Sequence, residues 1–146
     1  MSEEKYSSLV DDFCKLLPDT DAKQLKETGS MSVEGIEVTF VYMHDLIPGV
    51  LYVTCDLGLL ANADEKTCYQ KMLEINFFLI HQLGPQMAIH PETGEPLLIT
   101  RIPLDGFDAK SLLQVLQITI RMIKDWRSGS VSSFNVLADE IKKIDQ

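Results

Sequence analysis

Met87–Trp126 reads MAIHPETGEPLLITRIPLDGFDAKSLLQVLQITIRMIKDW, and this stretch decides the fold. Two short apolar segments, Met87–His90 and Leu97–Pro103, lie on either side of Pro91-Glu92-Thr93-Gly94. Proline sets φ for the first corner of a type I turn, and glycine accepts the positive φ that follows it. The stretch therefore predicts a β-hairpin with a glycine bulge.

A long helix follows the hairpin, and several residues mark its start. Asp108 suits the N-cap, because its carboxylate accepts hydrogen bonds from the free N–H groups of the first turn. Phe107 before the cap and Leu112 in the first turns fit a hydrophobic staple. These signals agree on one boundary and predict a helix over Ala109–Arg127.

The part of the chain before residue 60 predicts one helix and a set of strands. Apolar residues recur at helical spacing from Tyr6 to Leu17, and Pro18 ends this helix. Asp19–Ser30 is polar and predicts a loop with room for one helical turn. Two or three strands then follow. Residues 36–43 and 50–57 predict strands separated by a turn at Pro48-Gly49, and Glu34-Gly35 allows a small hairpin with residues 31–33.

A second long helix, over residues 63–82, carries more apolar surface than one sheet can cover. Asn62 fits its N-cap and Glu65 completes a capping box. Its two apolar stripes are Cys68, Met72, Ile75 and Leu79, and Tyr69, Leu73, Phe77 and Ile80. Two stripes make the helix apolar over more than half its circumference, so we expect a second subunit to cover the surplus. A closed two-fold dimer is the commonest arrangement.

These elements together predict an α+β fold with a mainly antiparallel, twisted sheet of about five strands. Three helices flank the sheet in the order helix, strands, helix, strands, helix. A Ser/Gly linker at residues 128–133 precedes a short C-terminal helix with Phe134, Leu137, Ile141 and Ile144 on one face. We therefore expect a single domain over residues 1–129 and a helical extension over residues 130–146.

Composition narrows the classes of function. With 146 residues, one domain is the default, and the length suffices for a core without disulfides. The net charge of −9 argues against nucleic-acid binding and against docking on anionic membranes. Three cysteines without CxxC spacing and a start without a basic, apolar leader predict a soluble, cytoplasmic protein with reduced thiols.

The sequence offers little for catalysis. Its histidines, His44, His81 and His90, are scattered, and no motif orients Cys55 or Cys68 as a nucleophile. Clustered metal ligands and phosphate-binding glycine motifs are also missing from the sequence. We therefore expect no enzyme activity, no cofactor and no metal, and a small thiol-dependent or hydrolytic enzyme remains as the contrasting hypothesis.

Apolar surface is the remaining candidate for function. A groove for an extended peptide is expected between the first helix and the outer face of the strands, or at an open sheet edge. The candidate partner-binding residues are Val10, Phe13, Leu17, Val38, Phe40, Tyr42 and Val53. For any single one of them, a place in the core is the commoner role.

The order of these features resembles class I type III secretion chaperones of the Tir chaperone family. The resemblance rests on the first helix before early strands, on the long middle helix, and on the turn His90-Pro91-Glu92-Thr93-Gly94. It continues with Arg101-Ile102-Pro103-Leu104 and with Phe107-Asp108 before the last helix, so that it covers about residues 3–127.

The resemblance implies a homodimer that binds the N-terminal segment of a secreted effector in extended form. Such a chaperone keeps that segment soluble and competent for export without ATP. The dimer contact is expected on the middle helix at Met72, Ile75, Asn76 and Leu79. The alternative is a peptide-binding regulatory module of the same fold with a client other than an effector.

Overall fold

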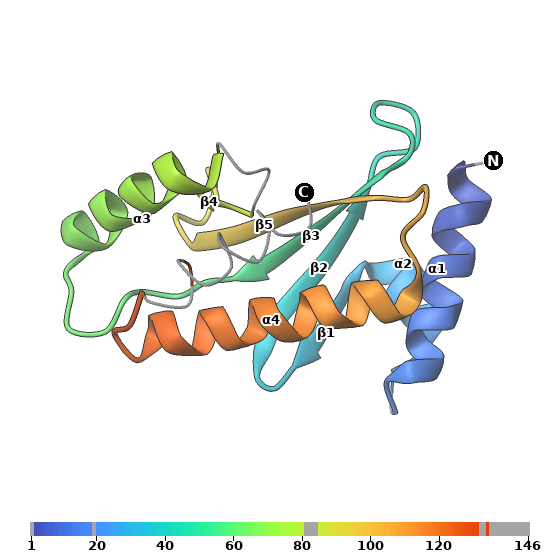
Figure 1. Cartoon of the computed structure of the whole chain (residues 1–146), viewed down its shortest axis with the longest axis horizontal. Helices are drawn as coiled ribbons and strands as arrows, with labels where there is room; N and C mark the ends of the chain where they lie inside the picture. Colours follow the sequence, from blue (N-terminus) through green and yellow to red (C-terminus); the bar gives the residue numbers. More distant parts are fainter. Residues whose placement is uncertain (1, 19, 81–84, 132–133, 135–146) are drawn as a thin grey trace. The chain divides into compact units, whose positions relative to one another are not determined.

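The computed structural model describes residues 2–18, 20–80, 85–131 and 134 (Figure 1). Its elements are α1 (Ser2–Leu16), α2 (Ala22–Thr28), β1 (Ser30–Val33), β2 (Ile36–Tyr42), β3 (Val50–Asp56), α3 (Glu65–Ile80), β4 (Gln86–Ile89), β5 (Pro96–Pro103) and α4 (Ala109–Arg127). The five strands form one sheet in the order β1-β2-β3-β5-β4. The expected α+β fold with an antiparallel sheet of about five strands is confirmed.

The first three strands form a meander whose turns come from local sequence. Glu34 and Gly35 take φ of 50° and 81°, so both corners of the β1–β2 turn are left-handed, as a two-residue hairpin requires. Along β2, burial alternates at Ile36, Val38 and Phe40, and the register pairs Phe40 with Val53 of β3. One face of these strands is therefore in the core.

The deciding stretch folds as expected. Gly94 has φ of 74°, and the His90 and Glu95 backbones pair at 2.9 Å to close the β4–β5 hairpin. Asp108 accepts a hydrogen bond from the backbone N–H of Ser111 at 2.8 Å, and α4 begins at the next residue, Ala109. The hydrogen bond lowers the pKa of the Asp108 carboxyl, because it favours the charged form.

The structure adds a helix where a loop with one turn was expected. Asp21 caps α2 by accepting from the backbone N–H groups of Lys23 and Gln24, and Gly29 ends it with φ of 72°. Leu25 is the buried residue that ties this short helix to the core. The expectation failed because Leu25 is the single large apolar residue among the seven and gives no helical period, although both caps are present in the sequence.

The start of α3 also differs from the expectation. Asn62 has φ of 61° and lies outside the helix. Asp64 is the capping residue, since its carboxylate accepts from the backbone N–H of Thr67 at 2.8 Å. The helix consequently begins at Glu65, two residues later than expected.

The described residues group into two compact units, each drawn from both halves of the chain. Leaving out the residues that the structure does not describe, the first comprises residues 2–55 and 101–118, and the second comprises residues 56–100 and 119–134. In the second unit, Trp126 is fully buried, and its indole N–H donates to the Gly58 carbonyl at 2.9 Å. The domain boundary at residue 129 stays a prediction, and the helix expected after Phe134 lies outside the described residues.

Candidate functional site

In the first unit, helix α1 packs on β2 through aromatic side chains. The Phe13 and Phe40 ring centroids are 5.7 Å apart, and those of Tyr6 and Tyr42 are 4.6 Å apart in a stacked pair. The Tyr42 hydroxyl donates to the Ser2 hydroxyl at 2.5 Å, which fixes the start of α1. Burial raises the pKa of Tyr6, since it disfavours the phenolate.

The structure brings the candidate partner-binding residues together, mostly in the interior of this unit. Five have relative exposures of 4% or less and two are partly exposed. The buried ones are Val10, Phe13, Val38, Phe40 and Val53, and the partly exposed ones are Leu17 and Tyr42. The partner-binding role of the set stays a prediction, and Leu17 and Tyr42 are its solvent-accessible members.

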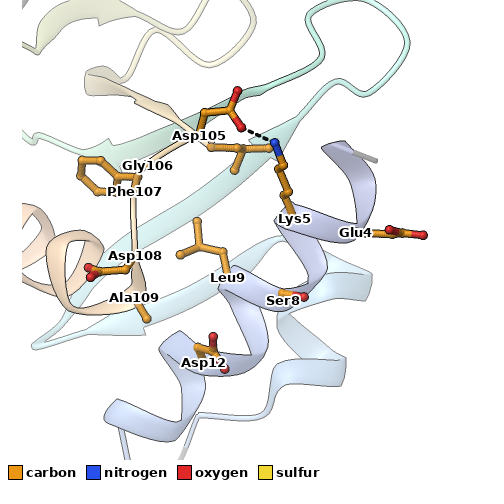
Figure 2. A pocket seen from close by; sticks show the side chains of 11 residues that line it. Glu4, Lys5, Ser8, Leu9, Asp12, Asp105, Gly106, Phe107, Asp108 and Ala109 are labelled. Carbon is orange, nitrogen blue, oxygen red and sulfur yellow. Dashed lines mark hydrogen bonds and ion pairs between the residues drawn. The ribbon is translucent and has the colours of Figure 1, made fainter.

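Two ion pairs hold the exposed side of α1. Lys26 of α2 lies 2.7 Å from Asp11, and Lys5 pairs with Asp105 in the segment before α4. Figure 2 shows the Lys5 ammonium pointing to the Asp105 carboxylate. Both residues line a cavity of about 580 Å³. The sequence did not predict this cavity, because its lining residues lie about 100 positions apart along the chain and no local pattern connects them.

In the second unit, the residues expected at a dimer contact are covered by their own chain. Met72, Ile75 and Leu79 are 3%, 9% and 1% exposed. The Asn76 side-chain amide donates to the Met87 carbonyl at 2.8 Å and accepts from the Met87 N–H at 2.7 Å. These bonds tie α3 to the free side of β4, and the role of all four residues in a dimer stays a prediction.

The opposite face of α3 carries the exposed apolar side chains. Leu73 is 71% exposed, Phe77 is 63% exposed and Phe78 is 62% exposed. The two phenylalanine rings meet edge to face with centroids 5.4 Å apart. Leu73 and Phe77 belong to the second apolar stripe of α3, which the helical spacing in the sequence had revealed. The spacing did not show which of the two stripes would be buried.

The two terminal strands of the sheet differ at their outer sides. On β4, Asn76 already binds the outward N–H and C=O groups of Met87. At the start of β1, the Phe40 N–H donates to the Gly29 carbonyl at 2.6 Å, so these two residues form a hydrogen-bonded pair. Hydrogen-bonded and non-hydrogen-bonded pairs alternate along an antiparallel ladder, so the N–H and C=O groups of Ser32, which lies opposite Glu37, point away from β2. The outer side of β1 therefore offers backbone groups to an added strand.

The described thiols are buried or partly buried, and His90 takes part in the hydrogen bonds of a turn. Cys55 and Cys68 are fully buried, and the pKa of Cys14 is raised by burial and by the nearby Asp11 and Asp21 carboxylates. The His90 Nδ1 atom accepts from the backbone N–H groups that follow it in the hairpin turn, at 3.2 and 3.3 Å. Within the described ranges, no three metal-ligating side chains cluster, and no helix is long and apolar enough to cross a bilayer.

Known proteins match the chain by sequence model and by structure. The model of the Tir chaperone protein (CesT) family matches residues 20–127, whereas no curated protein matches. The HopA1–SchA chaperone–effector complex has a chain with 19% identity and a TM-score of 0.67, covering 87% of this chain and 96% of its own.

Two further solved structures share the fold. The ExsC–ExsE complex matches at 16% identity and a TM-score of 0.66, covering 85% of this chain and 92% of its own. The Yersinia pestis type III secretion chaperone SycH, solved with a fragment of YscM2, matches at 17% identity and a TM-score of 0.60, covering 83% and 98%.

Proposed function

The chain belongs to the Tir chaperone protein (CesT) family, and from this premise we propose that it is a dimeric, cytoplasmic export chaperone. Its client is the N-terminal segment of a type III secreted effector, which it binds in extended form and keeps competent for secretion without ATP. The observation that carries the proposal is the family match over residues 20–127, joined by a fold shared with a chaperone–effector complex. The function is binding, and the chain is not an enzyme.

We place client binding on the first unit. Leu17 follows α1 and Tyr42 ends β2, and both are partly exposed, whereas Phe13 and Phe40 of the same elements are buried against each other. The outward backbone groups of Ser32 add a place where an extended segment pairs as a further strand. Backbone pairing supports affinity for varied sequences, whereas the apolar side chains select the client residues that face them.

We place the contact between two copies on α3. Leu73, Phe77 and Phe78 are each more than 60% exposed, and apolar side chains so arranged on one element are typical of an interface. The predicted contact residues Met72, Ile75 and Leu79 form the buried row of the same helix and support this face from below. Asn76 fixes the helix on β4 and so sets the direction in which the face points.

Co-expression with the protein encoded beside this chain's gene tests the proposal. We expect a stable complex of two chaperone copies with one client, measured by light scattering, and loss of the complex when the client's N-terminal segment is deleted. A concentration-independent monomer, or a complex that survives this deletion, would contradict the proposal. A stable complex with a protein that is not secreted would favour the regulatory module.

A further inference from the structure

A groove in the first unit lies between α1 and the segment that leads into α4. Its volume is about 580 Å³. It is lined by Glu4, Lys5, Ser8, Leu9, Asp12, Leu104, Asp105, Gly106, Phe107, Asp108 and Ala109, and we call it the Lys5 groove. Binding pockets for small ligands have similar volumes, and a few side chains of a peptide fill such a space.

The floor of the Lys5 groove is apolar. Leu9, Leu104 and Ala109 are 7%, 6% and 9% exposed, and Phe107 is half-buried beside them. Figure 2 shows Leu9 of α1 directed toward the segment before α4. An aliphatic side chain of a partner that entered here would contact carbon on both sides of the groove.

The rim of the Lys5 groove is acidic. Four of its lining residues carry carboxylates and one carries an ammonium group, so their formal charge is −3. Asp108 is occupied as the cap of α4, and Figure 2 shows the Glu4 carboxylate directed away from the groove. Asp12 and Asp105 are the remaining carboxylates; each faces an exposed lysine of the same chain, Lys15 at 3.7 Å from Asp12 and Lys5 at Asp105, and the rim as a whole attracts positive charge.

A cation already occupies this rim, since the Lys5 ammonium of the same chain pairs with the Asp105 carboxylate. The two side chains are 52% and 83% exposed. Exposed ion pairs favour the paired state by only about fivefold or less, so another cation can take the place of Lys5.

We propose that the Lys5 groove binds a client segment in which an arginine or lysine is flanked by aliphatic residues, with Lys5 holding the cation position in the free protein. The aliphatic side chains fill the floor at Leu9 and Leu104, and the client cation displaces Lys5 from Asp105, while Asp12 adds negative charge two turns further along α1. This inference deepens the proposed function and rests on it, since it names the residue chemistry of the client.

Titration of the ¹⁵N-labelled chain with three capped tripeptides tests the inference. The peptides are acetyl-Leu-Arg-Leu-amide, its citrulline analogue, which has the arginine shape without charge, and its glutamate analogue. We expect the arginine peptide to shift the amide signals of Ser8, Asp12 and Asp105–Ala109, at least threefold more tightly than the citrulline peptide and more weakly at 0.5 M salt. Equal binding of both peptides, or shifts confined to other residues, would overturn it.

Two variants with a matched control test the roles of the named residues. Asp12→Asn combined with Asp105→Asn should weaken the arginine peptide by roughly tenfold, whereas Glu92→Gln, a loss of charge in the β4–β5 turn, should leave it unchanged. Lys5→Gln should tighten the peptide by about two- to fivefold, because the competitor is gone. Weaker binding by Lys5→Gln would show that Lys5 is not a competitor.

The outcomes for the groove and for the proposed function remain separable. If an effector co-purifies equally well with the double aspartate variant and with the wild type, the groove inference fails and the chaperone proposal stands. If the chain binds no effector at all, the chaperone proposal fails, and the tripeptide titration still decides whether the groove prefers a cation between aliphatic residues.

Discussion

Replacing Phe77 by alanine tests whether the exposed face of α3 joins two copies. The side chain is 63% exposed in the single chain, and its neighbour Leu73 is 71% exposed. Because most of the Phe77 side chain lies outside the hydrophobic core of the single chain, we expect the variant to fold with nearly wild-type stability. The free energy lost should therefore appear in the association of the two copies.

The expected magnitude follows from the exposed fraction. Complete burial of a leucine or phenylalanine stabilises by about 1.5–3 kcal/mol, so the exposed part of Phe77 is worth about 1–2 kcal/mol. A two-fold interface contains each residue twice, and Phe77→Ala then costs about 2–4 kcal/mol. The dimer Kd should rise roughly 30- to 700-fold, since each 1.4 kcal/mol is a factor of ten.

Sedimentation equilibrium over a wide concentration range measures this Kd. Leu46→Ala is the matched control, because Leu46 is apolar and 78% exposed but lies in the β2–β3 loop of the other unit. Figure 1 shows that loop (teal) extending beyond the ends of its two strands. An unchanged Kd for Phe77→Ala together with Leu73→Ala, or an equal effect of Leu46→Ala, would refute the assignment of the dimer contact to this face.

Three further predictions concern stability and reactivity. Trp126→Phe removes the donor to the partly buried Gly58 carbonyl, so urea unfolding should show a loss of about 0.5–1.5 kcal/mol, and an unchanged midpoint would contradict the bond. Asp108→Asn keeps a cap but removes a carboxyl whose pKa is lowered from 3.8 in the fold. That carboxyl stabilises the fold above its unfolded pKa, and this stabilisation is lost as pH falls through its folded pKa. The wild type should therefore lose more stability than the variant below about pH 4, and circular dichroism during acid unfolding measures the difference. The raised pKa of Cys14 leaves little thiolate at neutral pH, so iodoacetamide should modify it more slowly than free cysteine, and equal rates would show that the thiol is not perturbed.

Elements with complete local signals could be predicted from the sequence. The β4–β5 turn has proline and glycine at the required corners, and Asp108 caps α4 one residue before the helix begins, so both were located correctly. Helix α2 was missed because Leu25 is its single buried residue and a period needs several. Asn62 and Asp64 are both good capping residues, and only the backbone shows that Asn62 is left-handed while Asp64 caps the helix.

The candidate site was less accessible to sequence reading, since it depends on which apolar surface the sheet covers. Both stripes of α3 contain large apolar residues, yet the chain buries Ile75 and leaves Phe77 exposed. Likewise, no spacing rule connects Lys5 with Asp105, because they meet only after the strands have brought their segments together. Local patterns determine elements, whereas a surface is defined by what remains uncovered after packing.

The two hydrogen bonds between Asn76 and Met87 also bear on polymerisation. A sheet with two open edges can grow in both directions, so edge-to-edge pairing propagates into fibres. Here one terminal strand has its central backbone groups occupied by an asparagine of the same chain. Two sheets that paired through β1 would each end at a β4 strand whose Met87 backbone groups are already bonded, so the joined sheet would not extend further at that residue. The Asn76 side-chain amide thus opposes edge-to-edge aggregation at β4, while the β1 edge stays available for pairing with a client strand.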